Sequence, residues 1–219
     1  MLRTRVVVQL IRAEWSLDIR RPAVLAAAAL QLLTMALLSF LTQPDIHGKT
    51  WNSLFWITLI FCTLQAISKN FLGLSRGRWI YWNQLAHPSE LLWSKMVYAW
   101  ISMAAFAVLN VLAFSAFMGM PIEHLAIYFL LVIGVAGGIA SIFTWVGALA
   151  TKANQSAFLA PVLSLPLLMP LILVGMGASA KCLNPILVSS TYKDLYLIGA
   201  LDFLILVMAG ILFPYLWKE

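Results

Sequence analysis

The chain has 219 residues, of which 63% are apolar or aromatic and only 10% are charged. An ordinary soluble domain is roughly 45–50% apolar and about 25% charged. A soluble domain of this size could not bury so much apolar surface, so lipid must be the solvent for much of the chain. The net charge of +6 does not indicate a nucleic-acid partner, because the basic residues stand between long apolar runs rather than in one patch. The composition therefore predicts an all-α integral membrane protein.

Residues 1–21 precede the first apolar run and predict a helix that lies in the inner membrane interface. Apolar residues recur every four positions from Val7 to Trp15, whereas Arg12 and Glu14 fall off that line. This spacing is typical of an amphipathic helix with arginines directed toward lipid head groups. A plain cytoplasmic tail rich in arginine is the alternative.

Six apolar stretches are long enough to be membrane spans within a single transmembrane domain, residues 1–219. A helix rises about 1.5 Å per residue, so roughly 20 apolar residues cross the hydrocarbon core. The predicted spans cover about 23–42, 51–67, 96–118, 125–149, 158–177 and 195–215.

The basic residues predict the orientation of these spans. With the N-terminus in the cytoplasm, eleven Lys and Arg residues fall in inner segments and only three fall in outer ones, namely Lys49, Lys181 and Lys193. Cytoplasmic segments carry the excess of Lys and Arg in multi-pass proteins. We therefore expect both termini to lie in the cytoplasm.

The sequence contains no recognisable catalytic constellation. There is no GxxxxGK[ST] phosphate loop, no HExxH, and no GxSxG, and Cys62 and Cys182 stand apart in different segments. Neither ATP hydrolysis by this chain nor a metal site is predicted, so we expect a protein that is not an enzyme.

The longest predicted cytoplasmic connection is 68–95, and it is unusually aromatic for a solvated linker. Trp79, Trp82 and Leu85 stand between arginines and Pro88. One interpretation is an aromatic belt at head-group depth. The other is a short helix that offers aromatic anchors to a partner protein.

The fifth span carries three prolines, Pro161, Pro166 and Pro170. Proline removes an amide donor and clashes with the preceding turn, so this span is predicted to be kinked or interrupted. A moving or substrate-lining helix and a static kink are both compatible with the pattern.

Small residues in the fourth span predict close helix packing. Gly134 and Gly138 have the GxxxG spacing that lets helix backbones approach each other. Packing within one subunit is the favoured interpretation, and a contact between two subunits is the alternative.

Two polar side chains lie inside predicted spans. Asp202 is about two turns from the outer end of the sixth span, and Asn110 lies in the third. Because an intramembrane carboxylate is costly, Asp202 is expected to face the bundle interior or a wet cavity. It could be a substrate or proton group, or an acid hydrogen-bonded to a neighbouring helix, and Asn110 has the same ambiguity.

Three stretches resemble the haem exporter protein B (CcmB) family, whose members are membrane subunits of an ABC transporter in cytochrome c maturation. The run from Leu165 to Leu173, LPLLMPLIL, resembles the family's LPxxxPLL run. The stretch from Gly77 to Lys95 resembles its loop of glycine, leucine, proline and lysine. The RAEW sequence that ends at Trp15 resembles its N-terminal basic–acidic signature, through Arg12 and Glu14. The resemblance extends over nearly the whole chain at low identity.

The resemblance implies a transporter subunit of the bacterial inner membrane that is driven by a separate ATP-binding subunit (CcmA-like). The 68–95 segment would be the coupling element, through Arg76, Gly77, Arg78, Trp79, Trp82, Leu85 and Pro88. It also implies that this subunit forms a homodimer. The implied haem-handling partners are two membrane proteins, one CcmC-like and one CcmD-like, and a CcmE-like haem chaperone. No bound cofactor is expected, haem is a candidate for the species handled, and ATP enters only through the partner.

The sequence is also compatible with two other functions. An ABC-2 type permease for a lipid or polysaccharide would have the same six-span plan. Relatives often carry acidic residues just before the loop glycine, where this chain has Leu74, Ser75 and Arg76. That departure keeps open an assembly membrane protein without an ATPase partner.

Overall fold

The computed structural model describes residues 4–19, 22–42, 48–72, 87–152, 156–183 and 188–217. All regular secondary structure in these ranges is α-helical. The helices are α1 (Thr4–Ile19), α2 (Pro22–Thr42), α3 (Gly48–Leu72), α5 (Pro88–Met118), α6 (Leu125–Lys152), α7 (Ser156–Lys181) and α8 (Val188–Trp217).

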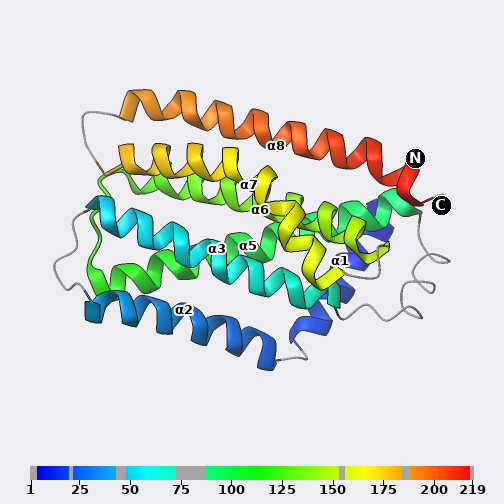
Figure 1. Ribbon diagram of the computed structural model, residues 1–219, viewed down its shortest axis with the longest axis horizontal. Helices are drawn as coiled ribbons and strands as arrows, with labels where there is room; N and C mark the ends of the chain where they lie inside the picture. Colours follow the sequence, from blue (N-terminus) through cyan, green and yellow to red (C-terminus); the bar gives the residue numbers. More distant parts are fainter. Residues whose placement is uncertain are drawn as a thin grey trace.

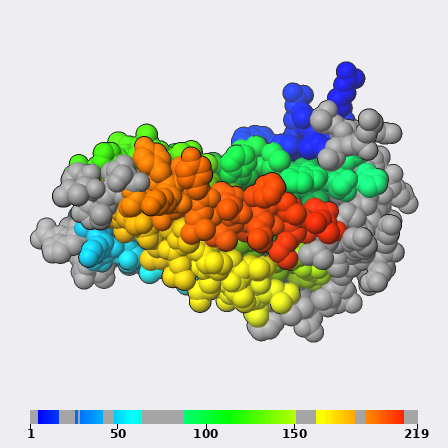
Figure 2. All heavy atoms as spheres, turned by 90° about the horizontal axis from the view of Figure 1, so that it is seen from above, coloured from blue at the N-terminus to red at the C-terminus, as the bar shows by residue number. Residues whose placement is uncertain are grey.

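The helices from α2 to α8 lie side by side and alternate in direction, which makes an elongated bundle (Figure 1). The first helix, α1, instead packs against α5 at the end of the bundle where α8 ends. Figure 2 shows α8, in orange and red, on the surface of the bundle with α5 on one side and α7 on the other.

Four helices of the described ranges are long and apolar enough to cross a membrane, in the segments Ser89–Met118, Leu125–Ala150, Val162–Lys181 and Ser190–Ile211. They coincide with the third to sixth predicted spans. Large apolar side chains are exposed on their outer faces, such as Leu173 and Phe203, as expected where lipid is the solvent. The protein is therefore an α-helical membrane protein. The first and second predicted spans, 23–42 and 51–67, lie within helices α2 and α3.

Two helices, α5 and α8, begin about two turns before the predicted spans, and polar contacts stabilise these added turns. The segment expected to be a loop up to Lys95 is already helical from Pro88, a residue that is pre-organised for the first position of a helix. The Glu90 carboxylate accepts a hydrogen bond from the backbone N–H of His87 at 3.2 Å, which satisfies one of the free donors there. In α8 the extra turns carry Asp194, whose charge is paired with Lys181 of α7 at 2.5 Å.

The centre of the bundle is α6, and its small residues explain that position. More than half of its apolar window is buried (56%), against 17% for α8. A β-carbon added to Gly138 would overlap Leu171 of α7 and Asp202 of α8, and one added to Gly137 would overlap the Trp100 ring of α5. The predicted packing within one subunit is confirmed for Gly138, whereas a β-carbon on Gly134 would make only an ordinary contact, 3.5 Å from Ile198 of α8.

Aromatic rings fill the end of the bundle opposite α1. Trp51 and Phe55 of α3 stack with centroids 5.7 Å apart and planes at 4°, and Phe114 and Tyr128 pack against them from α5 and α6. The neighbouring Trp56 indole donates to Ser179 Oγ of α7 at 2.8 Å. These contacts join α3 to α5, α6 and α7.

Replacing Gly175 with leucine is expected to destabilise the bundle at the junction of α3, α6 and α7. A β-carbon there would lie 2.9 Å from Val135 Cγ2 and 3.1 Å from Trp56 Cη2. Overpacking of a filled site costs roughly 1–3 kcal/mol. The measurement is the folded fraction of the purified protein across an SDS titration.

The matched control is Gly177→Leu in the same helix, because a β-carbon there meets no heavy atom of the described chain within 4 Å. Equal destabilisation by the two substitutions would contradict the packing described for Gly175.

Candidate functional site

The six coupling residues of the predicted loop from Arg76 to Leu85 lie outside the described residues. The seventh, Pro88, is the first residue of α5. The structure therefore describes the two helices that flank this segment, α3 up to Leu72 and α5 from Pro88. At this end of the bundle, the first turns of α5 are held by contacts with α1.

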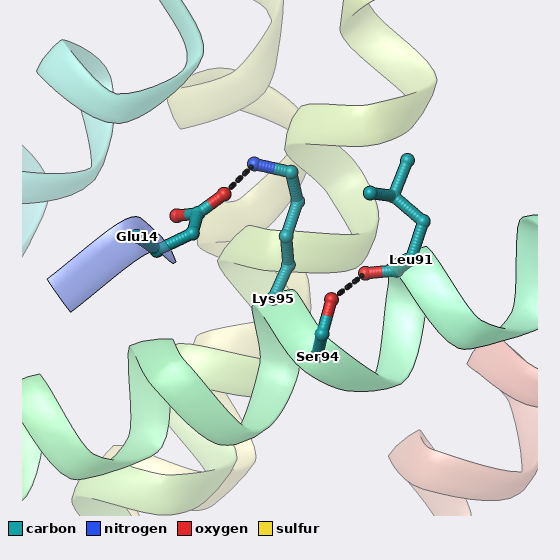
Figure 3. Close-up of polar contacts among 4 residues, drawn as sticks. All are labelled: Glu14, Leu91, Ser94 and Lys95. Atoms are coloured by element: carbon teal, nitrogen blue, oxygen red, sulfur yellow. Dashed lines mark hydrogen bonds and ion pairs between the residues drawn. The ribbon is translucent and has the colours of Figure 1, made fainter. Parts of the chain in front are cut away.

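Helix α1 is fixed to the start of α5 by an ion pair. The Lys95 ammonium lies 2.7 Å from Glu14 Oε1, and the two side chains are only 20% and 27% exposed. Figure 3 shows Glu14 reaching from α1 to Lys95, whose helix continues past Ser94. The Ser94 hydroxyl turns back onto its own helix and donates to the Leu91 carbonyl at 2.9 Å. The Glu14–Lys95 ion pair joins two residues that are 81 positions apart in the sequence.

Apolar contacts flank this ion pair on α1. Leu10 is buried and packs with Val6 of α1 and Leu91 of α5, while the Trp15 ring meets the Tyr98 ring edge-on at 6.4 Å. The side of α1 that packs on α5 is thus centred on Val6 and Leu10. The predicted apolar line from Val7 to Trp15 lies beside this packed side, and Trp15 is partly exposed although its ring touches Tyr98.

The two N-terminal residues named from the sequence have different environments. Arg12 is exposed, as predicted for a residue near head groups. Glu14 is instead partly buried against α5. An exposed ion pair contributes at most about 1 kcal/mol, and partial burial reduces screening by solvent. The pair therefore acts as a positional link between α1 and α5.

Asn110 ties two helices together at a fully buried position. Its Nδ2 donates to the carbonyl oxygen of Phe55 in α3 at 3.2 Å. Its Oδ1 has no hydrogen-bond partner within the described ranges. Of the two roles left open for this residue, the geometry supports a link between helices.

The prolines lie in a helix that continues through them. Helix α7 runs without interruption from Ser156 to Lys181 and includes Pro161, Pro166 and Pro170, and its path bends along its length (Figure 1). The side chains of Pro166 and Pro170 are exposed on the outside of the bundle. In this subunit they do not line an internal path.

Asp202 lies deeper in its span than the sequence analysis predicted. The apolar part of α8 begins at Ser190, so a rise of about 1.5 Å per residue puts Asp202 roughly 18 Å along it. The Oδ1 atom is buried and has no hydrogen-bond partner in the described part of the chain. It is directed toward Gly138 of α6, so the side chain faces the interior, as expected.

Possible metal ligands in the described ranges do not cluster, and the Cys182 thiol is enclosed. No three His, Cys, Asp or Glu side chains lie together there as a metal site would require. Cys182 follows α7 directly and is buried, and this burial raises the pKa of its thiol above the ordinary value. A protonated, enclosed thiol is a poor nucleophile at neutral pH.

Reversing the charge of Glu14 is expected to loosen α1 from α5. Losing an interaction of roughly 1 kcal/mol raises the detached population about fivefold, so Glu14→Lys should make proteinase K remove α1 correspondingly faster. Adding Lys95→Glu should restore the slower rate, because the pair is re-formed with its charges exchanged. Mass spectrometry of the digest gives the rates.

The control is Arg12→Glu, which reverses an exposed charge on the same helix. Cleavage that is equally fast in Arg12→Glu and Glu14→Lys, or a double reversal without rescue, would contradict the link between Glu14 and Lys95.

Comparison of the chain with protein-family models, curated proteins and solved structures finds no match in any of the three. The function proposed below therefore depends on the sequence pattern and on the geometry of the described residues.

Proposed function

We propose that this chain is the membrane subunit of an ABC transporter that works with a separate ATP-binding subunit. The observation that carries the proposal is the Glu14–Lys95 ion pair. It joins α1 to α5 about two turns after α5 begins at Pro88. A force applied to the segment before Pro88 would thus reach both α5 and α1 through a fixed contact.

The proposed arrangement has six membrane crossings with both termini in the cytoplasm. The alternating directions of α2, α3, α5, α6, α7 and α8 support it (Figure 1). The excess of Lys and Arg at the ends of the bundle that would face the cytoplasm also supports it. Helix α1 lies at that end and carries the exposed Arg12, which suits anionic head groups.

In the proposed mechanism, the ATP-binding subunit docks on the segment between α3 and α5. Trp79, Trp82 and Leu85 are the apolar anchors of the docking contact, since buried aromatic side chains carry much of the binding energy at interfaces. ATP-driven closure of the partner then displaces Pro88 and the first turns of α5. Because Lys95 holds Glu14, α1 moves with α5 at the inner end of the bundle.

For the biological role we propose cytochrome c maturation in the bacterial inner membrane, by resemblance to the haem exporter protein B family. ATP use would be coupled to haem export or to release of a haem-loaded periplasmic chaperone. Two copies of this subunit would pair with two ATP-binding subunits, beside the haem-handling membrane proteins. The Leu165–Leu173 run, with Pro166 and Pro170, supports this family rather than a lipid or polysaccharide permease.

Replacing Trp79, Trp82 and Leu85 together with aspartate is expected to abolish association with the ATP-binding subunit while membrane insertion persists. Charged side chains cannot fill the apolar pockets of a docking contact. The measurement is a pull-down of the tagged chain from native membranes, scored by ATPase activity in the eluate. Unchanged association would contradict the proposed coupling role. The control is a triple replacement with serine of the exposed residues Leu37, Leu38 and Leu41, which alters surface polarity elsewhere on the chain.

The proposed topology predicts which exposed positions an impermeant maleimide can reach in intact cells. In a variant without Cys62 and Cys182, a cysteine at Met120 should be labelled, because that exposed residue lies in the connection between α5 and α6. A cysteine at the exposed Ser16 should be labelled only after permeabilisation. The reverse pattern would overturn the orientation, and labelling of both from outside would overturn the three crossings proposed between Ser16 and Met120, namely α2, α3 and α5.

A further inference from the structure

A cavity of about 280 Å³ lies between α5, α6 and α8 and is partly open to the outside. Its lining side chains include Trp93, Met96, Trp100, Ser141, Asp202 and Leu206. The volume is near the lower end of the roughly 300–1,000 Å³ typical of small-molecule pockets. Because the lining is mostly apolar, the cavity suits a compact organic molecule rather than a hydrated ion.

Glycines of α6 line one side of the cavity. Gly134 and Gly137 contribute no side chains to its lining. The Trp100 ring lies directly against Gly137, and its indole N–H donates to the carbonyl oxygen of Ile133 at 3.3 Å. Trp100 is 45% exposed on the outside of the bundle. It therefore forms part of the wall between the cavity and the outside of the bundle.

Asp202 sets the charge preference of this cavity. Among the described residues that line the cavity it is the one with an ionisable side chain. Its Oδ1 is buried against Gly138 and has no hydrogen-bond partner in the described ranges, so the side chain meets the cavity through the rest of its carboxyl group. A carboxylate at this depth is costly, and a cation beside it offsets the cost. The chemical complement is therefore a positive charge.

From these features we infer that the cavity is a binding site for a small amphiphilic ammonium compound. The ammonium group pairs with Asp202, and the Trp93 and Trp100 rings add the attraction that indole rings have for cations. Met96 and Leu206 contact the apolar body of the ligand. The dianionic haem molecule would be repelled by Asp202, so this site is separate from the haem-related role proposed above and does not depend on it.

The position of Asp202 also identifies the source of the ligand. It lies roughly 18 Å along α8 from Ser190 and about 13 Å from Ile211, the two ends of the candidate span. Lipid head groups stay at the membrane surface, outside a hydrocarbon core about 30 Å thick. The ammonium group of a bilayer lipid would therefore not reach this depth, and the occupant is a free amphiphilic cation.

The test is binding of tritiated benzyltrimethylammonium to the purified full-length chain in lipid nanodiscs, measured by scintillation proximity. This probe keeps its charge at every pH, and its neutral isostere is neopentylbenzene. Saturable binding is expected, with neopentylbenzene competing at least roughly tenfold more weakly, because it cannot pair with the carboxylate. Asp202→Asn should weaken binding by a similar factor.

The matched control is Asp194→Asn, which removes a carboxylate from the same helix at a position paired with Lys181 and should leave binding unchanged. No saturable binding to folded wild-type protein would overturn the inference. Equal competition by the charged and neutral isosteres would also overturn it, even if Asp202→Asn failed to fold. Equal loss in both aspartate variants would assign the effect to net charge and would likewise reject the site.

Discussion

The arrangement of the bundle depends on glycines of α6, which leave room for the neighbouring helices. Between helices surrounded by lipid, close packing replaces the hydrophobic effect as the force that holds them together. Gly137 and Gly138 allow α5, α7 and α8 to approach the α6 backbone, and α6 is the most buried of the four candidate spans. The same feature leaves the cavity beside Trp100 and Asp202 unfilled. Tight packing and the candidate binding site therefore have one origin.

Polar contacts are placed where each is least costly. The Lys181–Asp194 pair lies at one end of the bundle and the Glu14–Lys95 pair at the other, so both charges of each pair can remain near the aqueous edge of the membrane. The buried Asn110 contributes only neutral hydrogen-bonding groups. Asp202 departs from this pattern, because it is an acid deep within a span. That departure is the physical reason for assigning it a ligand rather than a structural role.

The sequence predicted the elements better than their contacts, for physical reasons. Long apolar runs are a local signal, so the helices from α5 to α8 could be located from hydropathy alone. The start of α5 at Pro88 falls inside the predicted 68–95 connection, because a proline that interrupts a loop can also begin a helix. The pairing of Glu14 with Lys95 could not be predicted, since it joins residues 81 positions apart and depends on how α1 packs on α5. The depth of Asp202 was underestimated because the first turns of α8 are polar, so hydropathy put the start of the helix too late.

We propose that a separate ATP-binding subunit drives the movement of this chain. Affinity purification of the tagged protein from its native membrane in mild detergent, followed by mass spectrometry of the co-eluting proteins, tests it most directly. The account predicts a small ATP-binding subunit together with haem-handling membrane proteins. An ATPase with other companions would leave the coupling mechanism and replace the haem-related role. Co-purification without any ATP-binding protein, from membranes in which the bundle is folded, would contradict the account.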